Sequence, residues 1–157
     1  MKAADVATNA IARWLASSIK EPVWAYEDWG RGRPAVLRCG IRFDAIRMPA
    51  PLMHAALGTT VAEDVPAALA DALTGPVIAD HAQWFYALVP VGTCERWREA
   101  HSVGRGIGAW LGVPRLDQLG PDGVHWAQPI RRPGRLCEPD DVAAFVRKGS
   151  ACLAGDI

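Results

Sequence analysis

Apolar positions near the N-terminus recur at intervals of three and four residues, and they form one stripe made of Ile11, Trp14, Leu15, Ser18 and Ile19. This spacing predicts an amphipathic helix, and Pro22 is expected to end it. The following range, Val23–Pro34, holds two tryptophans and a Gly-Arg-Gly-Arg-Pro stretch, so we expect an irregular loop there.

Apolar and polar positions then alternate with a period of two. Ile41, Phe43 and Ala45 occupy one set of positions, and the other set begins with Arg42 and Asp44. The alternation predicts one half-buried strand over 36–48.

Further along, the pattern switches between short apolar runs and turn residues. Helices are expected at Leu52–Leu57, from Asp64 to Gly75, from Thr93 to about His101, and from Pro139 to Gly149. Strands are expected at Pro76–Ala79, Trp84–Val89, Ala109–Val113 and Gly123–Gln128, with the first two paired as a hairpin and a glycine turn at Gly104–Gly108.

These elements predict a single α+β domain over residues 1–157. We expect an antiparallel or mixed sheet of five to six strands with helices packed on it. A small doubly wound α/β fold is the alternative, and it is less favoured because strict alternation of strands and helices is missing.

Composition narrows the functional classes. The chain has 157 residues with 17 basic and 17 acidic side chains, so no net charge attracts it to DNA or to anionic lipid. No apolar run has the length of a membrane helix, and the first ten residues lack a signal peptide's apolar region. We therefore predict a cytoplasmic protein without membrane partners. Its four scattered cysteines are expected to be free, buried thiols.

The charges are nevertheless unevenly distributed. Five arginines lie between positions 31 and 47 against the single acid Asp44: Arg31, Arg33, Arg38, Arg42 and Arg47. The segment 48–80, called here the acidic segment, has no Lys or Arg and holds Glu63, Asp64, Asp71 and Asp80. Two interpretations remain open. The arginines bind phosphates while Trp24 and Trp29 stack on bases, or they pair with the acidic segment.

The remaining tryptophans are assigned by their predicted elements. Trp14, Trp84, Trp97 and Trp110 are expected in the core, whereas Trp126 is expected at a strand end, where it could bind.

Candidate catalytic residues are few. Asp44 is a carboxylate within an apolar strand, and Asp44, His81 and His101 are the weak candidates for catalysis. For Asp44, the favoured alternative is a salt bridge to Arg42 or Arg47, or a cap on backbone N–H groups. Cys94 shares a predicted helix with His101, but two ligands are too few for zinc, so no metal and no cofactor are predicted. Gly104–Ala109 fits G-x-G-x-x-A. It does not lie between a strand and a helix, which excludes a dinucleotide loop and leaves Arg105 as a possible anion contact.

One order of motifs resembles a known family. A Phe-Asp strand ending in proline (Arg42–Pro49) precedes a Gly-Pro-Val strand (Gly75–Val77), an aromatic strand ending in Leu-Val-Pro with Gly-Thr (Trp84–Thr93), and a glycine turn with a strand that ends at Pro114. This order, over about Arg38–Pro114, resembles the N-terminal primase-polymerase domains of actinobacterial proteins, in the archaeo-eukaryotic primase superfamily. The composition of the chain, which is rich in Ala and Arg and poor in Lys, is also typical of proteins from high-GC actinobacteria.

The family's three catalytic motifs are altered here. The first is Asp-x-Asp or Asp-x-Glu, but Asp44 is followed by Ala45-Ile46. The second is a histidine about six residues before the proline, where this chain has Trp84 and, three residues earlier, His81. The third is an acid before the glycine turn, where this chain has Arg105. The resemblance therefore implies the fold and a nucleotide contact, with the polymerase chemistry lost.

Three functional hypotheses follow. The first is a degenerate primase-polymerase-like domain that binds nucleotide or single-stranded nucleic acid through Arg31, Arg33, Arg38, Arg42, Arg47 and Arg105, with Trp24 or Trp29 stacking. The second is a non-catalytic protein-interaction or regulatory module, including a homodimer, because Trp and Arg also anchor protein interfaces. The third is an enzyme that uses Asp44, His81 and His101, with or without a metal.

Overall fold

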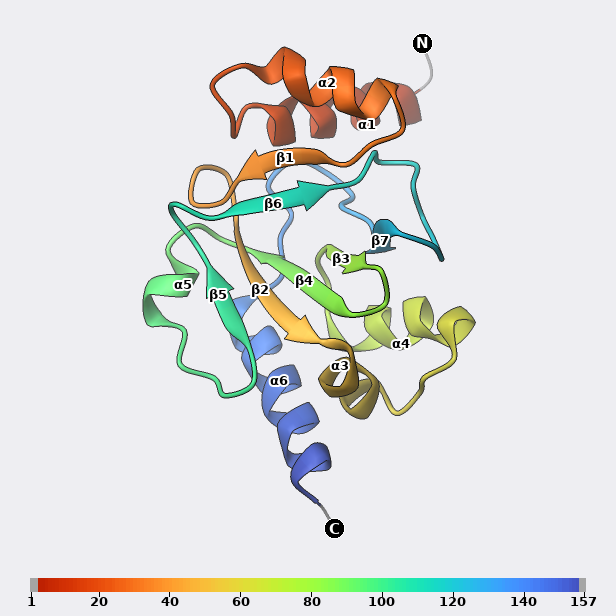
Figure 1. Ribbon diagram of the computed structural model, residues 1–157, viewed down its shortest axis with the longest axis vertical. Helices are drawn as coiled ribbons and strands as arrows, with labels where there is room; N and C mark the ends of the chain where they lie inside the picture. Colours follow the sequence, from red (N-terminus) through yellow and green to blue (C-terminus); the bar gives the residue numbers. More distant parts are fainter. Residues whose placement is uncertain (1–2, 156–157) are drawn as a thin grey trace.

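Helices and strands alternate irregularly along the chain (Figure 1). The computed structural model describes residues 3–155. Its elements are α1 (Ala3–Ala16), α2 (Pro22–Gly30), β1 (Ala35–Arg38), β2 (Asp44–Pro49), α3 (Ala50–Leu57), the 3-10 helix η1 (Ala62–Asp64), α4 (Val65–Ala72), β3 (Val77–Asp80), β4 (Trp84–Val89), α5 (Thr93–Arg96), β5 (Val103–Arg105), β6 (Trp110–Val113), β7 (Val124–Gln128) and α6 (Pro139–Ala154).

The strands form two antiparallel sheets. Five of them pair in the order β5-β2-β4-β3-β7, and β1 pairs with β6 in a separate two-stranded sheet. The predicted α+β class is confirmed, and the hairpin predicted from the two apolar runs is β3–β4. Because every neighbouring pair is antiparallel, the doubly wound alternative is wrong.

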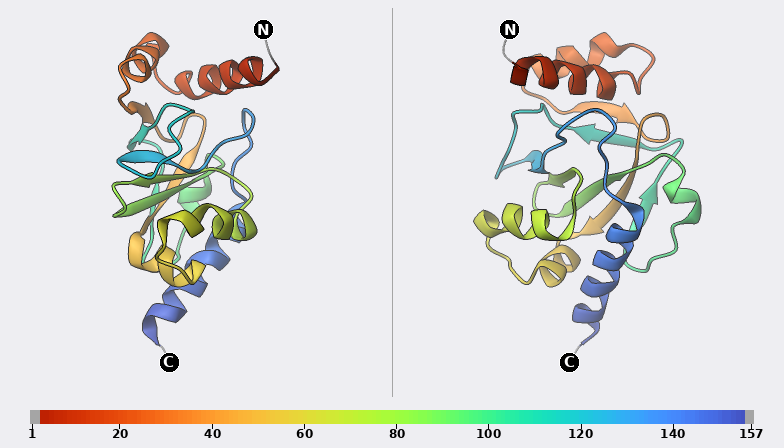
Figure 2. Two further views of the ribbon diagram at one scale, coloured as in Figure 1. Left: turned by 90° about the vertical axis from the view of Figure 1, so that its right-hand side faces the viewer. Right: turned by 180° about the vertical axis from the view of Figure 1, so that it is seen from behind.

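The two faces of the five-stranded sheet have different coverings. Side chains of one face, such as Ile46 and Met48, are buried in the core cluster that includes α3, α4 and α6. On the other face, Ala45, Leu88 and Trp126 pack against the β1–β6 sheet and the N-terminal helices. Figure 2 shows α3, α4 and α6 on one side of the sheet and α1 and α2 beyond β1–β6. Among residues 3–155, no helix lies on the part of this second face nearest α3 (Figure 2).

The strand predicted over 36–48 is two strands in different sheets. The chain turns at Gly40, which has φ +86° and whose N–H donates to the Phe43 carbonyl at 2.7 Å. A Cβ at Gly40 would lie 2.5 Å from the Ile107 Cα, so the close approach of the chain also requires glycine here. Period-two alternation continues through this turn, which is why the pattern alone did not locate it.

Four other predictions need correction. The glycine turn predicted at Gly104–Gly108 begins within the strand β5, which covers Val103–Arg105. Val23–Pro34 is mostly the helix α2, which begins at Pro22 and buries Ala25 and Trp29. The helix predicted from Thr93 to His101 is the single turn α5. The last helix continues through Gly149, the predicted stop, to Ala154. Within residues 3–155, no helix is both long enough and apolar enough to cross a bilayer.

Candidate functional site

The uncovered part of the five-stranded sheet carries arginine and aromatic side chains. Arg47 of β2 lies directly opposite Tyr86 of β4 on one side and Val103 of β5 on the other. Trp84 is two residues before Tyr86 and therefore projects from the same face. The Arg47 guanidinium carbon lies 4.4 Å from the centroid of the Trp84 ring, within the range of a cation–π interaction.

A second arginine–tryptophan pair lies on the outer face of the β1–β6 sheet. Arg38 and Trp110 are register partners, and the Arg38 guanidinium carbon lies 5.2 Å from the Trp110 ring centroid. Both residues line a groove of about 290 Å³ together with Val36 and Trp24. Trp24 is 61% exposed and Trp110 is 48% exposed, so both indoles are open to a ligand.

Arg105 of β5 connects the two pairs. Its Nη2 donates to the Trp110 carbonyl at 3.3 Å, and its charge also acts on the Tyr86 hydroxyl. Burial raises the pKa of Tyr86 and the charge of Asp80 raises it further, while Arg47 and Arg105 oppose both effects.

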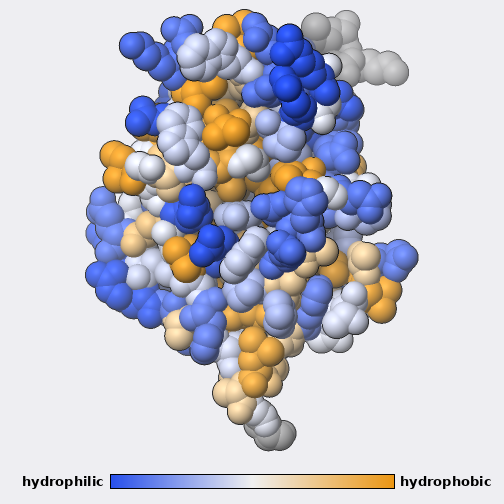
Figure 3. All heavy atoms as spheres, in the orientation of Figure 1, coloured by the Kyte–Doolittle hydropathy of each residue, from blue (hydrophilic) through white to orange (hydrophobic). Residues whose placement is uncertain are grey.

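We call this surface the arginine–aromatic face, defined by Trp24, Arg38, Trp110, Arg105, Arg47, Trp84 and Tyr86. Figure 3 views the molecule from the open side of the sheet, and strongly hydrophilic side chains lie there among pale, weakly polar ones.

Three of the six arginines proposed from the sequence lie on this face, namely Arg38, Arg47 and Arg105. Arg42 lies in the β1–β2 turn instead, where its Nε donates to Ser17 Oγ at 2.8 Å. Arg33 pairs with Asp28 at 3.3 Å, and Arg31 is an exposed residue just after α2. These three do not join the face.

Pairing with the acidic segment is not what the structure shows. Among the described residues, Arg33 is the one arginine of the 31–47 group that forms an ion pair, and its partner Asp28 belongs to α2. The arginines of the arginine–aromatic face therefore contact rings and carbonyls rather than carboxylates.

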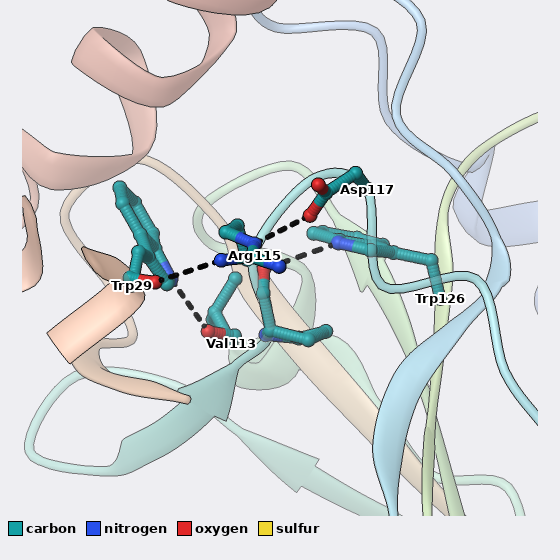
Figure 4. Close-up of polar contacts among 6 residues, drawn as sticks. Trp29, Val113, Arg115, Asp117 and Trp126 are labelled. Carbon is teal, nitrogen blue, oxygen red and sulfur yellow. Dashed lines mark hydrogen bonds and ion pairs between the residues drawn. The ribbon is translucent and has the colours of Figure 1, made fainter. Parts of the chain in front are cut away.

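Trp29 is a core residue, so its proposed stacking role is wrong. It is 6% exposed, and its Nε1 donates to the Val113 carbonyl at 2.9 Å (Figure 4). Trp126 is likewise buried, at 1% exposed, and its Nε1 donates to the Pro114 carbonyl at 3.1 Å. Trp110 is the reverse case: it is predicted for the core, but it is 48% exposed because it lies on the outer face of β6 and lines the groove beside α2.

Trp84, predicted for the core, and Tyr86 are both half-buried on this face. Their Trp-x-Tyr spacing places both rings on one face of a strand. That signal was available in the sequence, but whether the face is open depends on how far the β1–β6 sheet extends over it.

Asp44 occupies a second, separate site at the start of β2. The residue is 2% exposed, and its Oδ2 accepts hydrogen bonds from the Gly92 N–H at 3.0 Å and the Cys94 N–H at 3.1 Å. Its Oδ1 is buried and has no hydrogen-bond partner in the protein. The carboxylate lines a cavity of about 290 Å³ between the β1–β2 turn, the loop before α5 and the turn after β5.

Two thiols lie close to this carboxylate and are poor nucleophiles at neutral pH. Burial raises the pKa of Cys94 to about 12, and the charge of Asp44 adds to that effect. Burial also raises the pKa of Cys39 to about 11, although Arg105 opposes it. Cys39 and Cys137 are buried as predicted, whereas Cys152 is exposed and corrects the expectation that all four are buried.

The residues of the enzyme hypothesis are not brought together. His81 is exposed, with its Nδ1 2.6 Å from Asp80 Oδ1, and His101 is exposed, with its Nδ1 3.0 Å from Ser150 Oγ of α6. Neither histidine lines the Asp44 cavity, and His101 lies beyond the single turn of α5 that holds Cys94. Within the described chain, no three His, Cys, Asp or Glu side chains are grouped so that they could hold a metal ion.

Comparison of the chain with protein-family models, with curated proteins and with solved structures found no match. The resemblance to primase-polymerase domains therefore rests on the short motifs described above and stays a prediction.

Proposed function

We propose that this protein binds single-stranded nucleic acid, or a nucleotide as its minimal unit, on the arginine–aromatic face. One observation carries the proposal. Arg38, Arg47 and Arg105 lie among accessible aromatic rings on one side of the molecule, and none of the three forms an ion pair with a carboxylate within the described chain.

The chemistry of the face suits a single strand better than a duplex. Unpaired bases stack on tryptophan, tyrosine or a guanidinium plane whatever their sequence, and arginine binds the phosphates between them. Trp24 and Trp110 offer ring surface in the groove, while Arg47 and Arg105 offer positive charge on the sheet. Because the chain has no net charge, the attraction is local, and the binding is weak and sensitive to salt.

Loss of polymerase chemistry is part of the proposal. Metal-dependent nucleotidyl transfer uses two or more carboxylates that converge on the metal ions. Asp44 Oδ2 is occupied by two backbone N–H groups, and the next residue on its side of β2 is the buried Ile46. We expect no primer extension by the purified protein with nucleoside triphosphates and Mg²⁺.

A titration of labelled oligothymidylate, followed by fluorescence anisotropy, tests the binding proposal. Each aromatic–base stack contributes about 1–3 kcal/mol, so we expect Trp110→Ala to weaken binding about five-fold or more. Arg47→Ala is expected to weaken oligothymidylate binding also. Arg47→Lys should retain only part of the wild-type affinity, because lysine lacks the planar guanidinium group.

Arg132→Ala is the matched control, since Arg132 is an exposed arginine that lines a separate groove with Leu73 and Gln128. No binding by the wild-type protein at high micromolar concentration and low salt would refute the proposal. So would an Arg132→Ala effect as large as that of Arg47→Ala.

A protein-interaction module is the second candidate function, and one observation favours it. The groove beside α2 is largely apolar, with Ile19, Trp24, Val36 and Trp110 in its walls. Tryptophan and arginine in such a groove are typical anchors of protein interfaces. Sedimentation at several protein concentrations distinguishes a homodimer from a monomer, and competition by oligothymidylate shows whether both partners use this face.

A further inference from the structure

The cavity at Asp44 has the features of a small-molecule site that is separate from the arginine–aromatic face. Asp44 Oδ1 is a buried acceptor without a hydrogen-bond partner in the protein. Leaving such an oxygen unpaired costs free energy, and a carboxylate oxygen costs more than a neutral one. Asp44 lines the cavity, so a ligand that enters it can supply the missing donor.

The lining of the cavity favours a cation. Two acidic side chains, Asp44 and Glu95, line it, and no Lys, Arg or His does. Glu95 is exposed and takes part in none of the ion pairs between described residues. A positively charged ligand is therefore attracted both to the buried carboxylate and to the rim.

The hydrogen-bonding state of Asp44 selects among cations. Both oxygens of a carboxylate are needed for the bidentate fork of a guanidinium group. Here Oδ2 already accepts the N–H groups of Gly92 and Cys94, and only Oδ1 remains. An ammonium group binds as a point donor and needs only one carboxylate oxygen. A divalent metal ion is disfavoured because it requires about six oxygen ligands.

Glycines give the ligand room to reach the carboxylate. Gly40, Gly92 and Gly106 all line the cavity, and a Cβ at Gly106 would lie 3.6 Å from each carboxylate oxygen of Asp44. Val91 and Ile107 add apolar surface at the same cavity, which suits a short alkyl chain. A cavity of about 290 Å³ is at the small end of the range of ligand pockets, which suits a small compound.

We propose that this cavity binds a small primary alkylamine in its ammonium form, with one N–H donated to Asp44 Oδ1 and the alkyl chain lying against Val91 and Ile107. The proposal does not depend on nucleic-acid binding, because neither Arg47 nor any aromatic residue of the arginine–aromatic face lines this cavity.

The experiment is a titration of the ¹⁵N-labelled protein with n-butylammonium chloride, followed by amide NMR. A site with a Kd of about 1 mM would be nearly saturated at about 10 mM amine. We expect the Gly92 and Cys94 amide signals to shift and to saturate, because both N–H groups donate to Asp44. Tetramethylammonium has the charge without N–H donors, and n-butanol has the chain without the charge. Neither is expected to shift these signals.

Two variants test the assignment to Asp44. Asp44→Asn keeps the shape of the side chain, and its amide oxygen still accepts the two backbone N–H groups. Its NH₂ group takes the place of Oδ1 and offers the ammonium neither a charge nor an acceptor. Binding should therefore fall at least ten-fold. Gly106→Ala places a methyl group in front of the carboxylate and should also abolish binding, whereas Gly30→Ala, at a glycine with no atom within 4 Å of an added Cβ, should not.

Several results would overturn the proposal. The first is that butylammonium leaves the Gly92 and Cys94 signals unchanged, and the second is that tetramethylammonium or guanidinium shifts them as much as butylammonium does. The third is displacement of the amine by Mg²⁺, and the fourth is undiminished binding by a folded Asp44→Asn protein. If Asp44→Asn does not fold, undiminished binding by Gly106→Ala decides against it.

Discussion

Each of the two buried indole N–H groups donates to a backbone carbonyl at the end of β6. Trp29 of α2 bonds to Val113, and Trp126 of β7 bonds to the next residue, Pro114 (Figure 4). An indole N–H left unpaired in the core would cost about 1–3 kcal/mol, so these bonds decide where the two rings rest. They attach α2 and β7 to one point of the chain and remove both tryptophans from the surface.

The buried thiols predict a pH dependence of stability. Burial raises the pKa of Cys39 to about 11 and that of Cys137 to about 12, from 9.0. Above pH 9 these thiols ionise in the unfolded chain but stay neutral in the folded one, so the unfolded state binds fewer protons. The free energy of unfolding should therefore fall as the pH rises, by about 1.4 kcal/mol per pH unit for each thiol.

Urea denaturation at about pH 8 and about pH 10 measures this effect. Cys137→Ala should lose stability less steeply with pH than the wild-type protein, whereas Cys152→Ser, at an exposed position, should leave the slope unchanged. Equal slopes in the wild type and in Cys137→Ala would contradict the explanation.

At the scale of elements, the contact between α3 and α6 depends on a glycine inside a helix. A Cβ at Gly149 would lie 2.6 Å from the Leu52 carbonyl oxygen and 2.9 Å from Leu52 Cγ. The helix therefore runs through this residue, and the missing side chain lets the backbone of α3 approach. A glycine in a helical pattern is ambiguous, because it marks a helix end in one context and a helix crossing in another.

The replacement Gly149→Ala should destabilise the protein despite the higher helix propensity of alanine. Overpacking costs about 1–3 kcal/mol, and the propensity gain offsets up to about 1 kcal/mol of it. Gly30→Ala at the end of α2 is the matched control, since an added Cβ there meets no atom within 4 Å. Thermal unfolding should show a lower Tm for Gly149→Ala alone. An unchanged or raised Tm would show that α3 and α6 separate without cost.

Most elements could be predicted from local patterns, and the failures have a common cause. The hairpin β3–β4 and the strand β7 follow directly from apolar runs bounded by turn residues. The break at Gly40 and the helix α2 do not, because they depend on contacts with residues distant in sequence. Gly40 packs against Ile107, and Trp29 of α2 is buried with its Nε1 donating to the Val113 carbonyl. Contacts of that kind leave no periodicity in the chain.

For the whole molecule, a neutral chain with a local arginine patch predicts a modest dependence of binding on salt. Each phosphate contact to single-stranded nucleic acid contributes about −0.7 to the slope of log K against log salt, so Arg38, Arg47 and Arg105 together give about −2. Titrations between about 50 mM and about 200 mM salt measure this slope, and Arg105→Ala should make it shallower. A slope near zero would mean that these arginines do not contact phosphates.

The sequence by itself determined the α+β class, the positions of most strands and helices, and the excess of arginine before residue 48. It could not decide which arginines and tryptophans share a surface, because that depends on how far the β1–β6 sheet covers the five-stranded sheet. Only the tertiary structure placed Arg105 beside Arg47, buried Trp29, and left one oxygen of Asp44 unpaired in a cavity. Each of these depends on chain segments far apart in sequence, whose contacts local spacing does not encode.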